Sequence, residues 1–273
     1  MRVWLNGGFV PEAEASVSAA DRGFLLGDGA FETMRYQDGA IRRWPRHRAR
    51  LADALDVMAI AAPDFDAIEA AAGELAAERG LDRAALRLTV SRGPHGRGLA
   101  GPSGQAGTVL LTAAPLPDAP RPSRLVGVGA PRRDPFSLSA RFKTLGYADA
   151  IHARRQAVAM GGTMAVMLGH RGKVASTDCA SLFLIEGQRI FTPHLASGAL
   201  DSTSRAALIE AAGATGIIID EIEIGPERLA AVQAAFTLNA LTGVVGAESL
   251  DGRALRADHP LIARLSEIEA SAA

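Results

Sequence analysis

Residues 115–124 read PLPDAPRPSR, and four of these ten residues are proline. Proline concentrated between two patterned regions is typical of a connection rather than of a helix or strand. We therefore expect a linker at 116–122. It would separate a small N-terminal α/β domain at 1–115 from a large C-terminal domain at 123–273.

On the N-terminal side of this linker, short strands alternate with helices. The asparagine and glycines of VWLNGGFV (3–10) and the Asp38-Gly39 pair predict two hairpin turns. Residues 45–60 and 64–80 show helical spacing of apolar residues, and a glycine ends the second segment. The stretch LRLTV (86–90) alternates between apolar and polar residues, which predicts a half-buried strand.

The C-terminal side continues the same mixture. A strand is expected at 125–131 and a helix at 147–161. Residues 163–193 predict an antiparallel meander, in which VASTDCASLFLI (174–185) forms one strand. A helix at 204–216 follows, and further strands and a C-terminal helix close the domain. The pattern indicates the α/β class with mixed, largely antiparallel sheets in two domains, and not a regular βαβ array.

Composition narrows the classes of function. The net charge of −1 gives no field for gripping a polyanion, so we do not expect nucleic acid as a partner. A single cysteine, Cys179, cannot form an internal disulfide and suits a reducing compartment. The six histidines are scattered and no metal-binding motif is present, so no metal site is expected. With no signal pattern and no apolar run of membrane-spanning length, we expect a cytoplasmic protein and no membrane partner.

Lysine is rare in this sequence. Of 29 lysine and arginine residues, only Lys143 and Lys173 are lysine. A buried lysine can lose its proton and attack a carbonyl, whereas an arginine guanidinium stays charged. Lys143 stands at an expected strand-to-helix junction with Tyr147 one turn further on, which makes it the candidate for a Schiff-base lysine. The alternative is an ordinary surface lysine, and that is the role expected of Lys173 in the turn HRGK.

A Schiff-base lysine serves either a substrate carbonyl or pyridoxal phosphate. The cofactor would need a phosphate cradle. The stretch SGALDSTSRAAL (197–208) offers small hydroxyl residues at a predicted helix start, where free N–H groups and the helix dipole attract phosphate. Ser202, Thr203 and Ser204 are equally compatible with simple helix caps.

Seven short motifs along the chain carry a resemblance to a known family. They are GDGAFETMR at 27–35, HRARL at 47–51, SRGPHGRGL at 91–99, KTLGY at 143–147, VASTDCASLF at 174–183, SGALDSTSR at 197–205 and TLNALTGVVG at 237–246. In this order they resemble the class IV aminotransferases, the fold-type IV pyridoxal-phosphate enzymes. The resemblance implies a two-domain fold like that of D-amino-acid aminotransferase. It also implies pyridoxal 5'-phosphate as cofactor, a small-molecule amino substrate and a homodimer.

The resemblance also implies roles for individual residues. Lys143 matches the Schiff-base lysine and proton shuttle of the family. Arg50 matches the arginine that binds the cofactor phosphate, and Thr203 and Ser204 match its phosphate contacts at a helix start. Tyr147 matches the tyrosine that some members direct at the ring hydroxyl. The alternatives are a surface charge for Arg50 and a core aromatic for Tyr147.

Two positions depart from the family pattern. Members usually carry glutamate where this chain has Ser176, and that carboxylate keeps the pyridine nitrogen protonated. A serine can hydrogen-bond the nitrogen but brings no negative charge, so the ring should be a weaker electron sink. Asp178 would share the face of Ser176 in an extended strand, and a bulge is the alternative that presents it instead. The second departure is Gly146, where many members have asparagine.

The motifs most resemble the 4-amino-4-deoxychorismate lyases within the family. Phe31 begins the FET form of the first motif, which is commoner in the lyases and the D-amino-acid group. Of the carboxylate trap typical of the D-amino-acid enzymes, Arg97 remains, whereas Phe31 and Leu99 replace the other two residues. Phe31, Arg97 and Asn239 are thus the substrate-binding candidates. An aminotransferase of branched-chain or D-amino acids is the alternative, and a non-catalytic family member is the third.

Overall fold

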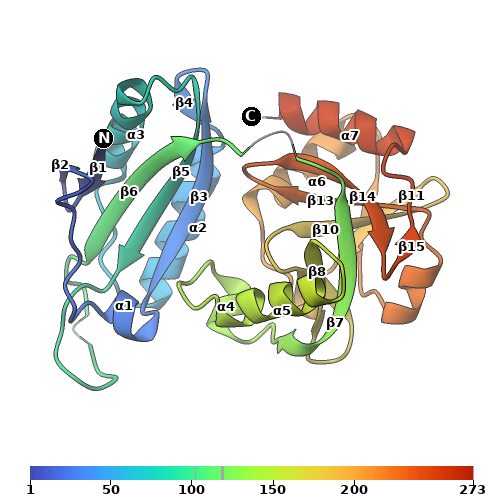
Figure 1. The fold of residues 1–273 in the computed structure, drawn as a ribbon, viewed down its shortest axis with the longest axis horizontal. Helices are drawn as coiled ribbons and strands as arrows, with labels where there is room; N and C mark the ends of the chain where they lie inside the picture. The colour runs from blue at the N-terminus through green and yellow to red at the C-terminus, as the bar shows by residue number, and fades with distance from the viewer. Residues whose placement is uncertain (102, 118–119, 273) are drawn as a thin grey trace. The chain divides into compact units, whose positions relative to one another are not determined.

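The computed structural model describes residues 1–101, 103–117 and 120–272. The chain divides into two compact units, drawn from blue to green and from green to red in Figure 1. The first unit is Met1–Pro117 together with Phe142–Gly146, and the second is Asp118–Arg141 together with Tyr147–Ala273. Residues 118 and 119 of the expected linker lie outside the described residues. The segment with Lys143 packs with the first unit, whereas the sequence placed it in the domain at 123–273.

The first unit is a six-stranded antiparallel sheet with helices on one face (Figure 1). Its strand order is β2-β1-β6-β5-β3-β4. The elements are β1 Arg2–Leu5, β2 Gly8–Pro11, α1 Arg22–Leu26, β3 Gly29–Gln37, β4 Ala40–Ile41, α2 Trp44–Val57, α3 Phe65–Glu78, β5 Arg83–Ser91 and β6 Thr108–Pro115. Both predicted hairpin turns are confirmed. In each turn the first residue, Asn6 or Asp38, and the glycine after it have positive φ, as a two-residue hairpin loop requires.

The alternation of β3 and β5 decides what each face of this sheet carries. Met34 pairs with Leu86 and Glu32 with Leu88, on the face that α2 and α3 cover with the apolar core. Phe31 pairs with Thr89 one residue away. Because side chains alternate along a strand, Phe31 lies on the opposite face. The predicted half-buried strand at 86–90 is therefore confirmed as part of β5.

The second unit contains a nine-stranded mixed sheet. The path runs β12-β11-β10-β13-β14-β7-β8-β9, and β15 pairs with β14. The strands are β7 Ser123–Arg133, β8 Met164–Gly169, β9 Val174–Thr177, β10 Ser181–Glu186, β11 Arg189–Pro193, β12 Ile219–Ile222, β13 Ala234–Asn239, β14 Gly243–Leu250 and β15 Arg253–Ala254. The helices are α4 Leu138–Arg141, α5 Ala148–Ala159, α6 Thr203–Ala214 and α7 Pro260–Ser271, with short 3₁₀ turns η1 Leu195–Ser197 and η2 Pro226–Ala230. The expected class, with mixed and largely antiparallel sheets, is confirmed.

The prediction that 163–193 forms one continuous antiparallel meander is wrong. The stretch 174–185 is not one strand, because the Thr177 hydroxyl and Ala180 exchange hydrogen bonds that turn the chain between β9 and β10. β9 then pairs with β8 at one end of the path, while β10 lies between β11 and β13. The pairs β7–β8, β7–β14 and β11–β12 are parallel, which alternation in the sequence does not show.

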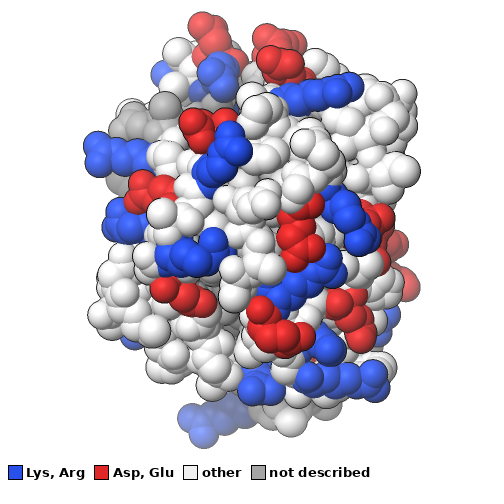
Figure 2. All heavy atoms as spheres, turned by 90° about the vertical axis from the view of Figure 1, so that its right-hand side faces the viewer, with Lys and Arg blue, Asp and Glu red and all other residues white. Residues whose placement is uncertain are grey.

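Surface charge on the second unit is mixed. Exposed or partly exposed ion pairs join Arg189 to Asp220 and Arg228 to Glu186. On the face drawn in Figure 2, basic and acidic side chains are interspersed among uncharged ones. None of the described helices is long and apolar enough to span a membrane.

Candidate active site

The segment with Lys143 is an extended strip held against the start of β3. The Phe31 N–H donates to the Lys143 carbonyl at 2.9 Å, and the Leu145 N–H donates to the Gly29 carbonyl at 2.9 Å. Ala30 and Thr144 form an antiparallel bridge between these two bonds. These bonds explain why the strip belongs to the first unit although helices of the second unit flank it in the sequence.

Lys143 and Phe31 are in direct contact. The Lys143 ammonium lies 4.3 Å from the centre of the Phe31 ring, and Lys143 is only partly buried. The Arg87 guanidinium lies 3.9 Å from the same ring centre. Phe31 is buried, at 4% exposure, so its ring is an apolar surface for two cations. Lys143 and Phe31, two of the site residues predicted from the sequence, are therefore in contact. Arg87 is a further neighbour of the ring that the sequence did not predict.

Arg50 is locked to a buried glutamate. Its Nε donates to Glu32 Oε1 at 2.7 Å and its Nη2 donates to Glu32 Oε2 at 2.6 Å. His47 Nδ1 donates to the same Oε2 at 2.7 Å. Burial raises the pKa of Glu32, but the charge of Arg50 and the hydrogen bonds from His47 and Arg50 lower it below its ordinary value. Arg50 is therefore not a simple surface charge.

Glu32 and His47 are site residues that the sequence analysis missed. Glu32 is the central letter of the FET motif, and His47 stands three residues before Arg50 on α2. Residues three apart share one face of a helix, so HRARL places the His47 ring and the Arg50 guanidinium toward the same strand. The spacing of His47 and Arg50 could have predicted that the two side chains share a partner. Only the packing of α2 against β3 shows that this partner is the carboxylate of Glu32.

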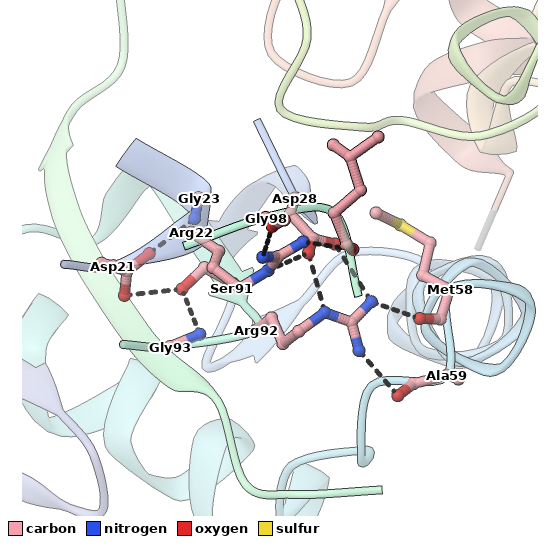
Figure 3. A network of polar contacts seen from close by, with 11 residues as sticks. Asp21, Arg22, Gly23, Asp28, Met58, Ala59, Ser91, Arg92, Gly93 and Gly98 are labelled. Atoms are coloured by element: carbon pink, nitrogen blue, oxygen red, sulfur yellow. Dashed lines mark hydrogen bonds and ion pairs between the residues drawn. The ribbon is translucent and has the colours of Figure 1, made fainter. Parts of the chain in front are cut away.

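Arg97 lies on the exposed loop between β5 and β6. Its side chain and that of Leu99 are exposed, and Leu99 is 86% exposed. The loop backbone, in contrast, is tied to buried side chains of the same unit (Figure 3). Lys143, Phe31, Arg50 and Arg97 thus all belong to the first unit, and Lys143 and Phe31 are in direct contact.

The other predicted residues belong to the second unit. Tyr147 caps the start of α5 and is partly buried. Arg133 lies within its electrostatic reach. Burial lowers the pKa of Arg133, and Tyr147 and Asp149 oppose this change. Arg133 also donates to the Gly198 carbonyl at 2.6 Å. It therefore connects the surroundings of Tyr147 to the turn that precedes α6.

Ser176 is buried on β9 at 7% exposure. Its hydroxyl donates to the Thr177 carbonyl at 2.8 Å. The carboxylate of Asp178, two residues further on, is paired, because Arg154 of α5 donates to both of its oxygens. Burial raises the pKa of Asp178, and Arg154 opposes this change. The bulge that would present Asp178 in place of Ser176 stays a prediction.

The start of α6 has the properties of an anion site. Ser202 is the N-cap and accepts from the Arg205 N–H at 3.4 Å. Thr203 and Ser204 are buried in the first turn. Among the described residues, the Ser204 hydroxyl has no hydrogen-bond partner although it is buried. A buried hydroxyl at a helix N-terminus fits a phosphate, which accepts hydrogen bonds and favours the positive end of the helix dipole.

Asn239 has a clear structural role. Its side-chain oxygen accepts from the Leu241 N–H, the Thr242 N–H and the Thr242 hydroxyl, at 3.0, 3.0 and 3.1 Å. This oxygen builds the turn between β13 and β14. Only its amide nitrogen remains a candidate for substrate contact.

A comparison with protein families identifies the class. The family described as amino-transferase class IV matches residues 29–250, which include most of both units. The chain belongs to this family. Its members are pyridoxal-phosphate enzymes, so the expected fold class, cofactor and enzymatic nature are confirmed.

Similar proteins come from two branches of the family. A putative branched-chain-amino-acid aminotransferase of Methanocaldococcus jannaschii is 28% identical, over 93% of this chain and 90% of that protein. An aminodeoxychorismate lyase of Bacillus subtilis is also 28% identical, over 89% of this chain and 84% of that protein. The solved structure of a putative 4-amino-4-deoxychorismate lyase from Legionella pneumophila has a TM-score of 0.89 at 28% identity, and the match covers 96% of this chain and 97% of that one.

Proposed function

We propose that the protein is a 4-amino-4-deoxychorismate lyase that releases pyruvate and 4-aminobenzoate. Ser176 is the observation that carries this proposal. It stands where the family pattern has glutamate, and the neighbouring carboxylate, Asp178, is paired with Arg154. Pyridoxal phosphate supplies an aldehyde for the substrate amine and a ring that takes up electrons. Without a carboxylate beside its nitrogen, that ring is a weaker electron sink.

This weakness matters less to a lyase than to an aminotransferase. Elimination of pyruvate leaves an aromatic ring, and aromatisation supplies driving force that transamination lacks. Lys143 would hold the cofactor covalently and remove the proton at the amine-bearing carbon through its Nζ. The contact of that Nζ with the apolar Phe31 ring supports this role, because it places the amine beside a surface that excludes water.

Arg50 is one candidate to bind the cofactor phosphate, and the start of α6 is another. The bidentate pair with Glu32 fixes the orientation of the Arg50 guanidinium. The buried hydroxyl of Ser204 and the first N–H groups of α6 would add hydrogen bonds. Arg97 is the candidate for a substrate carboxylate, and Phe31 and Asn239 are candidates for lining the substrate. Tyr147 is the candidate partner of the cofactor ring hydroxyl.

The proposal is tested with the purified protein loaded with pyridoxal phosphate. Incubation with aminodeoxychorismate should release pyruvate and 4-aminobenzoate in equal amounts. An amino donor given alone should bleach the visible absorbance of the loaded enzyme much more slowly than pyruvate is released. No pyruvate together with rapid bleaching by a donor would contradict the proposal.

An aminotransferase of branched-chain or D-amino acids is the second candidate. The archaeal relative described above favours it, because that protein is as similar to this chain as the bacterial lyase is. Bleaching by leucine or its D-isomer, followed by recovery of the absorbance with a 2-oxo acid, would support this candidate.

We also propose a homodimer in the cytoplasm. Three consecutive apolar residues of α1 are exposed: Phe24 at 78%, Leu25 at 57% and Leu26 at 53%. Arg22 at the start of α1 binds the backbone of Leu99, whose side chain is exposed as well. Exposed apolar side chains gathered in one region favour a protein partner. Light scattering should give twice the mass of the chain, and Phe24→Asp should reduce it to one chain.

A further inference from the structure

The loop that carries Arg97 is fixed from inside the first unit. Arg22 Nη1 donates to the Gly98 carbonyl at 2.7 Å (Figure 3), and Nη2 donates to the Leu99 carbonyl at 2.9 Å. One guanidinium thus holds the carbonyl groups of the two residues that follow Arg97. The Arg22 side chain is almost completely buried, whereas the loop above it is exposed.

Arg22 is in turn held by Asp28. Its Nε donates to Asp28 Oδ2 at 2.8 Å. Burial raises the pKa of Asp28, but the hydrogen bonds and charges of Arg92 and Arg22 lower it below its ordinary value. Asp28 is therefore charged at neutral pH and fixes the plane of the Arg22 guanidinium.

The same carboxylate holds a second arginine. Arg92 donates from Nε to Asp28 Oδ2 at 2.7 Å and from Nη2 to Oδ1 at 3.1 Å (Figure 3). It also donates to the Met58 and Ala59 carbonyls at 2.6 and 3.1 Å, at the C-terminal end of α2. Cations are favoured at that end of a helix. Asp28 therefore connects the Arg97 loop to the helix that carries Arg50.

Packing strengthens this connection. A Cβ placed on Gly101 would lie 2.6 Å from Arg92 Cδ and 3.1 Å from Arg22 Nε. The loop backbone therefore rests directly on both arginine side chains. Asp21 adds a further tie, because it accepts from the hydroxyls of Ser91 and Thr108, at 2.8 and 2.6 Å, where the loop leaves and rejoins the sheet.

We propose that Arg22, oriented by Asp28, is a positioning residue that sets the Arg97 side chain for a substrate carboxylate. The proposal rests on the substrate role proposed above for Arg97. A binding group on an exposed loop needs such support, because a displacement of about 1 Å can cost about a hundredfold in rate. Arg22 supplies it through the carbonyls of Gly98 and Leu99, the two residues after Arg97, without contact to the substrate.

Arg22→Lys distinguishes the effect of the positive charge at position 22 from the effect of the hydrogen bonds that hold the loop. Lysine keeps a positive charge beside Asp28 but lacks the planar fork that reaches both carbonyls. We expect KM for aminodeoxychorismate to rise about tenfold with kcat changed less than about twofold, as expected when binding is lost but the chemical step is not. Arg79→Lys is the matched control. Arg79 also joins a carbonyl and a carboxylate within the first unit, those of Arg2 and Glu12, and its variant should leave KM unchanged.

A double-mutant cycle shows whether Arg22 acts through Arg97. Arg97→Ala should raise KM by itself, and adding Arg22→Lys to it should raise KM no further. Hydrogen exchange in peptides covering 93–101 should be faster in Arg22→Lys than in the wild type, and unchanged in Arg79→Lys. Gly101→Ala, which crowds both arginines without removing a charge, should reproduce the rise in KM.

The outcomes separate this proposal from the proposed function. The positioning role would be overturned if Arg22→Lys raised KM equally in the wild type and in Arg97→Ala. An unchanged hydrogen-exchange rate of the loop in Arg22→Lys would overturn it as well. No pyruvate from the wild type would overturn the lyase assignment, and the same cycle would then be measured on KM for an amino donor. An Arg97→Ala variant with unchanged KM for either substrate would overturn the role of Arg97 and the positioning role with it.

Discussion

The Arg50 guanidinium contacts both carboxylate oxygens of Glu32, at 2.7 and 2.6 Å, and His47 binds one of them. Glu32 is 1% exposed, so this pair is largely shielded from water. Breaking a buried pair by removing one partner costs about 3–5 kcal/mol, because the remaining charge is left uncompensated.

Glu32→Gln should therefore lower the free energy of unfolding at neutral pH by about 3 kcal/mol. It should also weaken binding of pyridoxal phosphate, since Arg50 loses its orientation. Denaturant titration and absorbance titration measure the two effects. Asp66→Asn, which removes an exposed pair with Arg48, should cost less than about 1 kcal/mol. Equal losses in the two variants would contradict the buried-pair account.

The same pair predicts a pH dependence. The folded-state pKa of Glu32 lies below the ordinary value of 4.5. The carboxylate therefore stabilises the fold fully above the unfolded-state pKa and loses this contribution as the pH falls through the lower folded-state pKa. The stability gap between wild type and Glu32→Gln should shrink as the pH is lowered from neutral to about 3. A gap that is constant over this range would show that the charge of Glu32 does not carry the effect.

Lys143→Ala should abolish the covalent attachment of the cofactor. Loss of a positioned base alone reduces a rate by about 10²–10⁴. We therefore expect the turnover of Lys143→Ala to fall by about a thousandfold or more. Lys173→Ala is the control, because Lys173 lies in the turn between β8 and β9 and is the other lysine of the chain. Visible absorbance that survives in Lys143→Ala would contradict the assignment of Lys143.

Ser176→Glu tests the explanation based on the electron sink. A carboxylate at this place should hold a proton on the pyridine nitrogen and speed bleaching by an amino donor by about tenfold. Pyruvate release should change less, because aromatisation already drives it. Ser176→Ala controls for the loss of the hydroxyl. If Ser176→Glu leaves the rate of bleaching unchanged, Ser176 does not face the ring nitrogen.

Ser204→Ala should separate cofactor binding from protein stability. The Ser204 hydroxyl has no partner among the described side chains and backbone groups, so its loss should not destabilise the protein without cofactor. One lost hydrogen bond to a phosphate should raise the dissociation constant of pyridoxal phosphate by about tenfold. Ser202→Ala removes a helix cap and should instead lower the free energy of unfolding by about 1 kcal/mol. A reversed pattern would contradict the anion site.

Local patterns predicted much of this fold. The turns at Asn6 and Asp38 and the alternation in β5 are confirmed, because each depends on a few neighbouring residues. The division of residues 174–185 into β9 and β10 was missed, because it depends on the partners of each strand far along the chain.

For the candidate site, the sequence likewise predicted single residues but not the long-range contacts between them. Lys143 stood out through the scarcity of lysine, and Arg50 through a motif. The sequence did not show that Lys143 packs with the first unit, because the Phe31 and Gly29 backbone groups that hold it lie more than a hundred residues away. Glu32 was missed for the same reason, since its two partners, His47 and Arg50, come from a helix that follows the strand.

The central claim is that this family member is a lyase. The most direct measurement compares two rates on one preparation of the loaded enzyme: pyruvate release from aminodeoxychorismate, and bleaching of the visible absorbance by an amino donor. We predict that pyruvate release is the faster process by at least about a hundredfold. Bleaching that is as fast as pyruvate release, or bleaching without any pyruvate release, would contradict the claim.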